Sequence, residues 1–145
     1  MIYQRPMFYN PMGYDLHMVC GDNEWFEFNL DPVNPLTYWD ATGGDWQPDR
    51  HFFTDRGSQG YFVSMVPGFE RNRLAYLFHD SAYTWVAWKG HGLYYRAPDQ
   101  IEFTFRPMTR RQVDDLMREM LITEGVRPWA ARCIWAAVRA FGRRW

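Results

Sequence analysis

The stretch TRRQVDDLMREML, residues 109–121, decides the type of structure in the last third of the chain. Thr109 and Gln112 have the spacing of a capping box, in which each side chain bonds the backbone amide of the other residue. An apolar stripe follows at helical spacing: Val113, Leu116, Met117, Met120 and Leu121. The pattern predicts a helix that begins after Thr109 and stops at Gly125, because glycine suits the left-handed position that ends many helices.

Helices are predicted on both sides of this stretch. Before it, side chains recur at spacings of three and four from residue 71 to Gly90, with Asn72 as a candidate cap: Leu74, Leu77, Phe78, Ser81, Trp85 and Trp88. After it, Pro128 suits the first turn of a helix that runs to about Phe141 and stops at Gly142. Three arginines in its last turn and tail complement the carbonyl end of that helix: Arg139, Arg143 and Arg144.

The first two-thirds of the chain predict strands and turns instead. Two segments alternate apolar and polar residues, and we expect their apolar residues to face inward: Phe26, Phe28 and Leu30 in residues 24–30, and Ile101, Phe103 and Phe105 in residues 101–106. Residues 60–66 predict a short buried strand, and turn clusters fall at residues 31–35 and 42–45. The expected fold class is therefore α+β, with a small antiparallel sheet and about three helices, mostly in the C-terminal half.

The composition limits the classes of protein that fit. A chain of 145 residues with 47% hydrophobic and 19% aromatic residues predicts one domain and excludes a disordered chain. The formal net charge of −1 argues against wrapping nucleic acid, and two cysteines are too few for a disulfide-stapled scaffold. No apolar run approaches the ~18 residues of a membrane span, and we expect no signal peptide. We expect one domain over residues 1–145, with an irregular, partner-packed arm over 1–50 and a core over 51–145.

The stretch FHDSAY, residues 78–83, carries the residue types with the clearest chemistry. His79 and Tyr83 are four residues apart and so share one face of the predicted helix. Imidazole takes and gives a proton near neutral pH, and a carboxylate must hold it in one tautomer if it is to act as a base. Asp114 on the next helix is the candidate, with Asp115 behind it. In the alternative interpretation, His79 and Asp114 satisfy each other in a structural contact between helices.

In a second cluster, residues 53–58, three residues of types common in turns surround a glycine: Thr54, Asp55 and Ser58. Such residues bond nearby backbone amides in ordinary turns, so the cluster predicts a loop, with substrate contact as the alternative. Five residues are of types that bind zinc or calcium, although their spacing is not diagnostic: His51, Asp55, His79, Asp80 and His91. The candidate metal ligands are Asp80 and Asp55. Cys133 is expected to pack as a small hydrophobe, and Cys20 lies in an expected loop with no obvious base nearby.

Taken in order, these motifs resemble a family of small tailed-phage proteins, domain-of-unknown-function family 1353. The resemblance covers about residues 52–145 and rests on five elements: Thr54-Asp55-x-x-Ser58, His79-Asp80-x-x-Tyr83, Thr109-Arg110 with Asp114, Gly125, and Val138-Arg139-x-x-Gly142 with Trp145. Members usually have a proline soon after the serine, whereas Gln59 follows Ser58 here and the nearest proline is Pro67. The resemblance implies a phage source and a gene among tail and lysis functions. We therefore expect other virion proteins as partners and a location in the virion or the host cytoplasm.

The His-Asp-x-x-Tyr string is also similar to the central helix of secreted phospholipase A2. That likeness implies that His79 activates a water, Asp80 holds calcium, and Tyr83 supports the orienting carboxylate of Asp114. The glycine- and cysteine-rich calcium loop of those enzymes and their flanking cysteines are missing from this sequence.

The sequence leaves two functions open and favours the first. One is a structural or assembly component of a phage tail, baseplate or neck, in which His79, Asp80 and Asp114 hold helices in register. The other is a small hydrolase of host envelope lipid or peptidoglycan. In it His79 is the general base, Asp114 orients it, and Asp80 with Asp55 forms a cation or substrate site. Nucleic-acid binding, which rests only on the basic tail at residues 141–145, is not expected.

Overall fold

Two antiparallel sheets and three helices make up the part of the chain that the computed structural model describes, residues 5–20, 25–54, 70, 73–84 and 92–141. The larger sheet has the order β1-β4-β5-β7-β8: β1 (Met7–Tyr9), β4 (Thr37–Trp39), β5 (Asp45–Gln47), β7 (Gly92–Arg96) and β8 (Thr104–Pro107). The smaller sheet has the order β2-β3-β6: β2 (Tyr14–Cys20), β3 (Trp25–Leu30) and β6 (His51–Thr54). The α+β fold class is confirmed.

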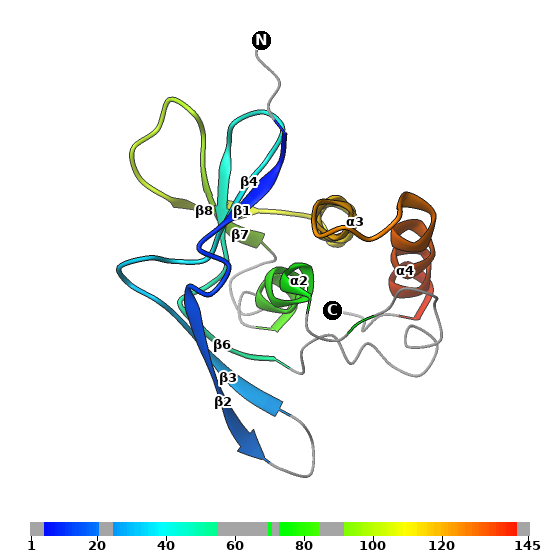
Figure 1. Cartoon of the computed structure of the whole chain (residues 1–145), viewed down its shortest axis with the longest axis horizontal. Coiled ribbons are helices and arrows are strands. Elements are labelled where there is room, and N and C mark those ends of the chain that lie inside the picture. The colour runs from blue at the N-terminus through cyan, green and yellow to red at the C-terminus, as the bar shows by residue number, and fades with distance from the viewer. Residues whose placement is uncertain (1–4, 21–24, 55–69, 71–72, 85–91, 142–145) are drawn as a thin grey trace.

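The helices are α2 (Leu74–Thr84), α3 (Arg110–Thr123) and α4 (Pro128–Phe141), and they lie on one side of the larger sheet (Figure 1). Helix α2 contacts β6 of the smaller sheet, β7 of the larger sheet, and α3, while α4 packs against α3. Helix α2 is therefore central, because it contacts both sheets and the next helix. None of the described helices has the length and apolar character needed to cross a membrane.

Aromatic side chains fill the space between these elements. The rings of Phe28 and Phe52 stack with centroids 4.4 Å apart and join β3 to β6. Phe8 of β1 lies between Tyr38 of β4 and Phe78 of α2, at centroid distances of 4.9 Å and 5.9 Å. Such pairs add about 0.5–1.5 kcal/mol each beyond the area they bury. The aromatic surplus of the sequence is thus partly explained by a core that ties α2 to both sheets.

The predicted strands are confirmed in one case and shifted in another. Strand β3 matches the expectation for residues 24–30, with Phe28 fully buried. Strand β8, by contrast, begins only at Thr104, and Ile101, which was expected to face inward, is 89% exposed. A turn delays the pairing, because the amide of Gln100 donates to Ala97 and the Gln100 side chain accepts from the Ala97 amide. Phe105 was also expected to face inward, but it pairs with Tyr94 on the side of the sheet away from the helices.

The N-terminal segment that was expected to be irregular contains strands β1 to β5 within residues 5–50. Turns between these strands lie at the turn clusters that the sequence predicts, residues 31–35 and 42–45. The Asp40 carboxylate accepts bonds from the amides of Thr42 and Gly44 and from the Trp46 indole, which closes the β4–β5 hairpin. The strand expected at residues 60–66 lies outside the described residues.

The predicted helices α3 and α4 are confirmed. Both bonds of the capping box between Thr109 and Gln112 are present, and Gly125 follows α3 with a φ of 97°. Helix α4 spans Pro128–Phe141, as the sequence predicts.

Helix α2 begins at Leu74, and the candidate cap Asn72 lies outside the described residues. The amides of Leu74 and Ala75 instead donate to the two carboxylate oxygens of Glu124, at 2.8 Å and 2.7 Å. A carboxylate at a helix N-terminus satisfies amides that have no partner within the helix and interacts favourably with the helix dipole. Glu124 thereby anchors the start of α2 to the end of α3.

We expect Glu124→Ala to lower the free energy of unfolding by about 1–2 kcal/mol, since both capping bonds are lost. Glu124→Gln keeps one oxygen acceptor and is expected to lose about half as much. Urea denaturation at pH 7 measures both values. Glu102→Ala, which removes an exposed glutamate, is the matched control and is expected to change stability by less than about 0.5 kcal/mol. Equal stability of Glu124→Ala and the wild type would contradict this anchoring role.

Candidate functional site

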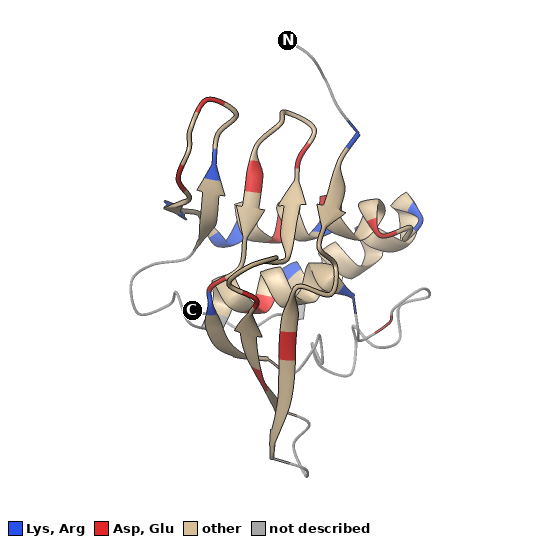
Figure 2. Cartoon of the chain, turned by 60° about the vertical axis from the view of Figure 1, so that its left-hand side comes forward, with Lys and Arg blue, Asp and Glu red and all other residues tan. Residues whose placement is uncertain are grey.

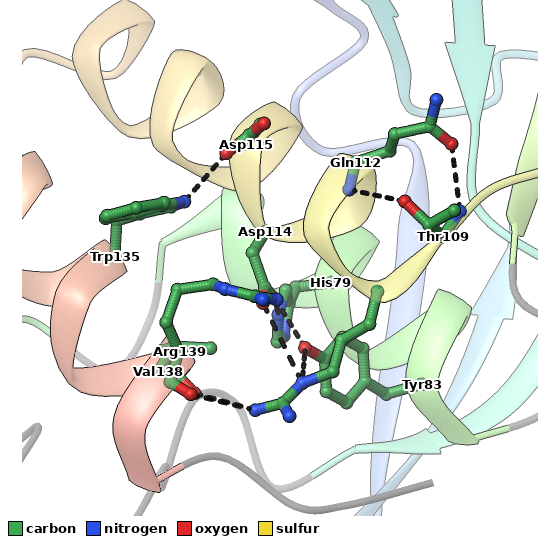
Figure 3. Close-up of polar contacts among 10 residues, drawn as sticks. His79, Tyr83, Thr109, Gln112, Asp114, Asp115, Trp135, Val138 and Arg139 are labelled. Atoms are coloured by element: carbon green, nitrogen blue, oxygen red, sulfur yellow. Dashed lines mark hydrogen bonds and ion pairs between the residues drawn. The ribbon is translucent and has the colours of Figure 1, made fainter.

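The carboxylate of Asp114 lies at the centre of a buried polar cluster between the three helices (Figure 3). His79 Nε2 is 2.7 Å from Asp114 Oδ1, and both side chains are fully buried. The hydroxyl of Tyr83 donates to the same carboxylate oxygen. The predicted meeting of His79 and Asp114 is therefore present in the structure.

The local sequence explains why these groups meet. His79 and Tyr83 are one helical turn apart on α2, and their rings lie 4.0 Å apart between centroids. Asp114 belongs to the buried side of α3, next to Val113 and close to Met117, so its side chain points at α2 rather than at solvent. The packing of α2 on α3 then brings the imidazole, the phenol and the carboxylate together.

Two arginines complete the cluster on the side of α4. Arg139 donates to Asp114 Oδ2 at 3.0 Å, while Arg110 Nε lies 3.9 Å from the same oxygen. Arg110 also donates to the backbone oxygen of Val138 at 3.1 Å and to the Tyr83 hydroxyl at 3.3 Å. The carbonyl end of α4 is thus bonded by Arg110 of α3, whereas Arg139, which was expected to complement that end, turns to Asp114. Arg110 and Asp114 are four residues apart on one helix, and this spacing is the sequence signal that identifies Arg110 as a partner of Asp114.

The surroundings set the protonation states of the cluster. Burial raises the pKa of Asp114, but the hydrogen bonds from His79, Tyr83 and Arg139 outweigh burial and hold that pKa below its usual value. Burial, followed by the bond to Asp114, raises the pKa of Tyr83 well above its usual value. Asp114 is therefore a carboxylate at neutral pH, and Tyr83 is a neutral donor.

The ionised carboxylate also decides the tautomer of His79. A carboxylate only accepts hydrogen bonds, so His79 Nε2 carries the hydrogen that lies between it and Asp114 Oδ1. In a neutral imidazole the other ring nitrogen, Nδ1, then holds the lone pair. This is the arrangement that a histidine base requires.

Asp80 points away from this cluster. Its carboxylate accepts a hydrogen bond from Thr54 Oγ1 at 2.6 Å, and both side chains are buried. The adjacent residues His79 and Asp80 thus connect α2 in two directions, to α3 and to β6. Asp55 and Ser58, the other members of the predicted loop cluster, lie outside the described residues.

The described residues do not fit a zinc or calcium site. In this part of the chain no three His, Cys, Asp or Glu side chains lie close enough to hold a metal ion. His51 contacts Glu27 at 3.3 Å on the exposed side of the smaller sheet, and Asp80 is bonded to Thr54. Asp55 and His91 fall outside the described ranges.

Asp115 and Cys133, two residues near the cluster, do not have the surroundings that the sequence predicts. Asp115 accepts a bond from the Trp135 indole at 2.8 Å and so joins α3 to α4 rather than supporting His79 (Figure 3). Cys133 was expected to pack as a small hydrophobe, which is wrong, because it lies on the exposed side of α4. The side of α4 that faces α3 is instead occupied by Ala131, Ile134 and Val138.

The fold and the cluster define an α+β protein with a buried histidine–carboxylate pair between helices. The chain belongs to the family described as protein of unknown function (DUF1353), whose family model matches residues 32–138. The match begins before β4 and ends in α4, so it includes every residue of the Asp114 cluster except Arg139. No curated protein and no solved structure matches the chain.

The low pKa of Asp114 predicts a pH-dependent contribution to stability. In the unfolded chain this carboxyl group protonates near pH ~3.9, whereas in the folded chain it stays ionised to lower pH. The contribution is therefore present above about pH 4 and is lost as pH falls through the folded value. We expect Asp114→Asn to lower the free energy of unfolding by about 3 kcal/mol at pH 7, because it breaks a buried pair.

Urea denaturation of both proteins between pH 7 and pH 3 measures this difference. We expect the gap between wild type and Asp114→Asn to narrow below about pH 4. Asp99→Asn, at an exposed position, controls for the loss of one carboxylate and is expected to show no such gap. A gap that stays constant over this range would contradict an ionised Asp114 in the folded state.

Proposed function

We propose that this protein is a small hydrolase of the host envelope, acting on lipid or peptidoglycan, in which His79 is the general base and Asp114 orients it. The single observation that carries the proposal is the 2.7 Å contact between His79 Nε2 and a fully buried, ionised carboxylate. The same contact is expected if the cluster only holds the helices in register, so our preference for the hydrolase rests on the way the cluster fixes the carboxylate and the imidazole.

The cluster supports the base in two ways. Asp114 fixes the hydrogen on Nε2 and would stabilise the positive charge that forms on the imidazole when Nδ1 takes a proton. Tyr83 bonds one oxygen of Asp114 and Arg139 bonds the other, which restrains rotation of the carboxylate away from the imidazole. Such preorganisation is what distinguishes a catalytic pair from an exposed ion pair.

The proposed reaction is the hydrolysis of an acyl bond. His79 Nδ1 takes a proton from a water while the water oxygen attacks the acyl carbonyl and forms a tetrahedral intermediate. The intermediate then collapses, the bond to the leaving alcohol or amine breaks, and the leaving group takes the proton back from the imidazolium. The products are a carboxylic acid and an alcohol or amine, and the neutral His79 is restored.

Stability alone is a weak explanation for this cluster. Replacing a buried ion pair by apolar side chains is often neutral or stabilising, because the charges lose their hydration. Here a carboxylate, an imidazole and two guanidinium groups converge in a layer otherwise filled by apolar helix residues. Groups of this kind gather at functional sites more readily than in purely structural cores.

The burial of His79 and Asp114 limits how a substrate could reach the imidazole. His79 is 2% exposed, so substrate reaches Nδ1 only when the surfaces that cover the ring move apart. The proposed reaction therefore requires a rearrangement that exposes the imidazole before substrate binds.

We expect the wild-type protein to hydrolyse phospholipid vesicles or purified peptidoglycan, with turnover measured as released fatty acid or as new amino groups. His79→Gln and Asp114→Asn are each expected to lower the rate by about 100- to 10,000-fold, the usual contribution of a general base. Tyr83→Phe keeps the His–Asp pair and removes one bond, so we expect a loss of about tenfold.

The matched control is His51→Gln, which removes an exposed histidine of the smaller sheet. It is expected to keep the wild-type rate, and circular dichroism confirms that each variant is folded. Absence of turnover on both substrates, or a wild-type rate for folded His79→Gln, would exclude the hydrolase.

A phage particle component is the second candidate, and the exposed apolar side chains favour it. Met18 and Val19 in the last residues of β2 are 64% and 56% exposed, and Trp129 of α4 is 54% exposed. Side chains of this kind are frequent where protein surfaces bind each other. Quantitative mass spectrometry of purified particles is expected to show a fixed copy number that matches the tail symmetry if this candidate is correct, and absence from particles excludes it.

A further inference from the structure

The larger sheet has a second face, which points away from the helices and carries partly exposed aromatic side chains. The pairing of the strands places two rows of residues on this second face. One row runs from Met7 through Trp39 and Asp45 to Arg96. The other runs from Tyr9 through Gln47 and Tyr94 to Phe105. Figure 2, in which this side of the molecule is turned forward, shows the strands in front of the helices. We call these two rows the outer face.

Aromatic rings on the outer face lie in two groups. Tyr9 and Trp39 stack with centroids 5.6 Å apart, and Tyr94 meets Phe105 edge-on at 6.0 Å. Trp39 on β4 and Tyr94 on β7 are two strands and two residues apart, which is about 12 Å at the usual strand spacing and rise. The face therefore offers two partly exposed aromatic pairs, which we call platforms, with polar residues between them.

A cavity of about 390 Å³ opens beside the second platform. Tyr94 and Phe103 supply its aromatic lining, while Gln47, Asp49 and Arg50 supply polar groups. Gln47 lies directly across from Tyr94 and donates to Thr37 Oγ1 at 3.2 Å, which holds its amide in place. The volume lies within the range of about 300–1,000 Å³ that small-ligand pockets occupy.

Positive and negative side chains on the outer face are balanced in number, and this balance limits the kinds of ligand that the face is expected to bind. Arg96 forms an ion pair with Asp45 at 2.6 Å and lies over the Phe103 ring at 4.5 Å. Asp49 and Arg50 form a second set of opposite charges in the cavity lining. Proteins that stack single-stranded nucleic acid on aromatic side chains add a positively charged groove for the phosphates, and this face has no excess of positive charge.

We propose that the outer face binds a neutral saccharide chain. The aromatic platforms would stack on the apolar C–H faces of sugar rings, and the Gln47 amide and Arg50 would bond sugar hydroxyls in the cavity. A ligand with many hydroxyl groups and no net charge fits a site whose own charges already neutralise one another. This face is on the side of the larger sheet opposite to His79, so the proposal stands independently of the hydrolase.

Binding is tested on the whole chain with three neutral saccharides, N-acetylglucosamine trimer, maltotriose and cellotriose, by tryptophan fluorescence and nuclear magnetic resonance titration. We expect at least one of them to bind, with shifts at Tyr94 and its neighbours. Tyr94→Ala is expected to weaken binding at least tenfold, whereas Tyr94→Phe keeps the platform and most of the affinity. Arg50→Ala, which alters an exposed side chain, is expected to weaken binding without loss of fold.

The matched control is Phe53→Ala, which removes a partly exposed aromatic side chain from the smaller sheet and is expected to leave binding unchanged. Failure of all three saccharides to bind at millimolar concentration overturns the proposal. Binding of an oligo-dT strand that is lost in Tyr94→Ala would assign the face to nucleic acid instead. A dimer of the wild type that Tyr94→Ala dissociates would assign it to a second copy of the chain.

Discussion

The carboxylate of Asp114 is the constraint on which the helical layer depends. It belongs to α3, it accepts bonds from His79 and Tyr83 of α2, and Arg139 of α4 binds its second oxygen. A buried charge of this kind is costly unless it is paired and hydrogen-bonded, so the placement of the three helices that brings these partners to Asp114 is favoured. Hydrogen bonds depend on direction more strongly than apolar contacts do, so this set of bonds constrains the helices more closely. The same placement brings the imidazole into the position that a base requires.

Local patterns predicted the parts of the fold that local interactions form. Helix α3 follows from Thr109, Gln112 and its apolar stripe, because the cap and the stripe lie within one segment. The start of α2 did not follow, since its capping carboxylate comes from Glu124, about fifty residues away in sequence. Strands β1, β4 and β5 have three residues each, too few for an alternating pattern to be visible. Strand β8 was placed too early because alternation does not reveal the turn that Gln100 forms.

In the candidate site, too, the sequence predicted the contacts that depend on local spacing and missed those that depend on distant packing. The spacing of His79 and Tyr83 on one helix and the apolar neighbours of Asp114 predicted that these three groups could meet. The bonds of Arg139 to Asp114 and of Thr54 to Asp80 depend on how distant elements pack, and no spacing in the sequence reports that. The exposure of Cys133 also depends on packing, because only the side of α4 that faces α3 is buried.

The family match begins at residue 32, after β3, although the smaller sheet depends on what precedes it. β3 supplies the strand neighbour that β6 has in the described part of the chain, and Phe28 fills the space beside Phe52. A fragment cut at the family boundary would keep β6 but lose that neighbour, leaving backbone amides and an aromatic ring open to association with other chains. The residues that the family model matches therefore do not include all the residues on which β6 packs. A shortened form of the chain would have to retain β3 as well.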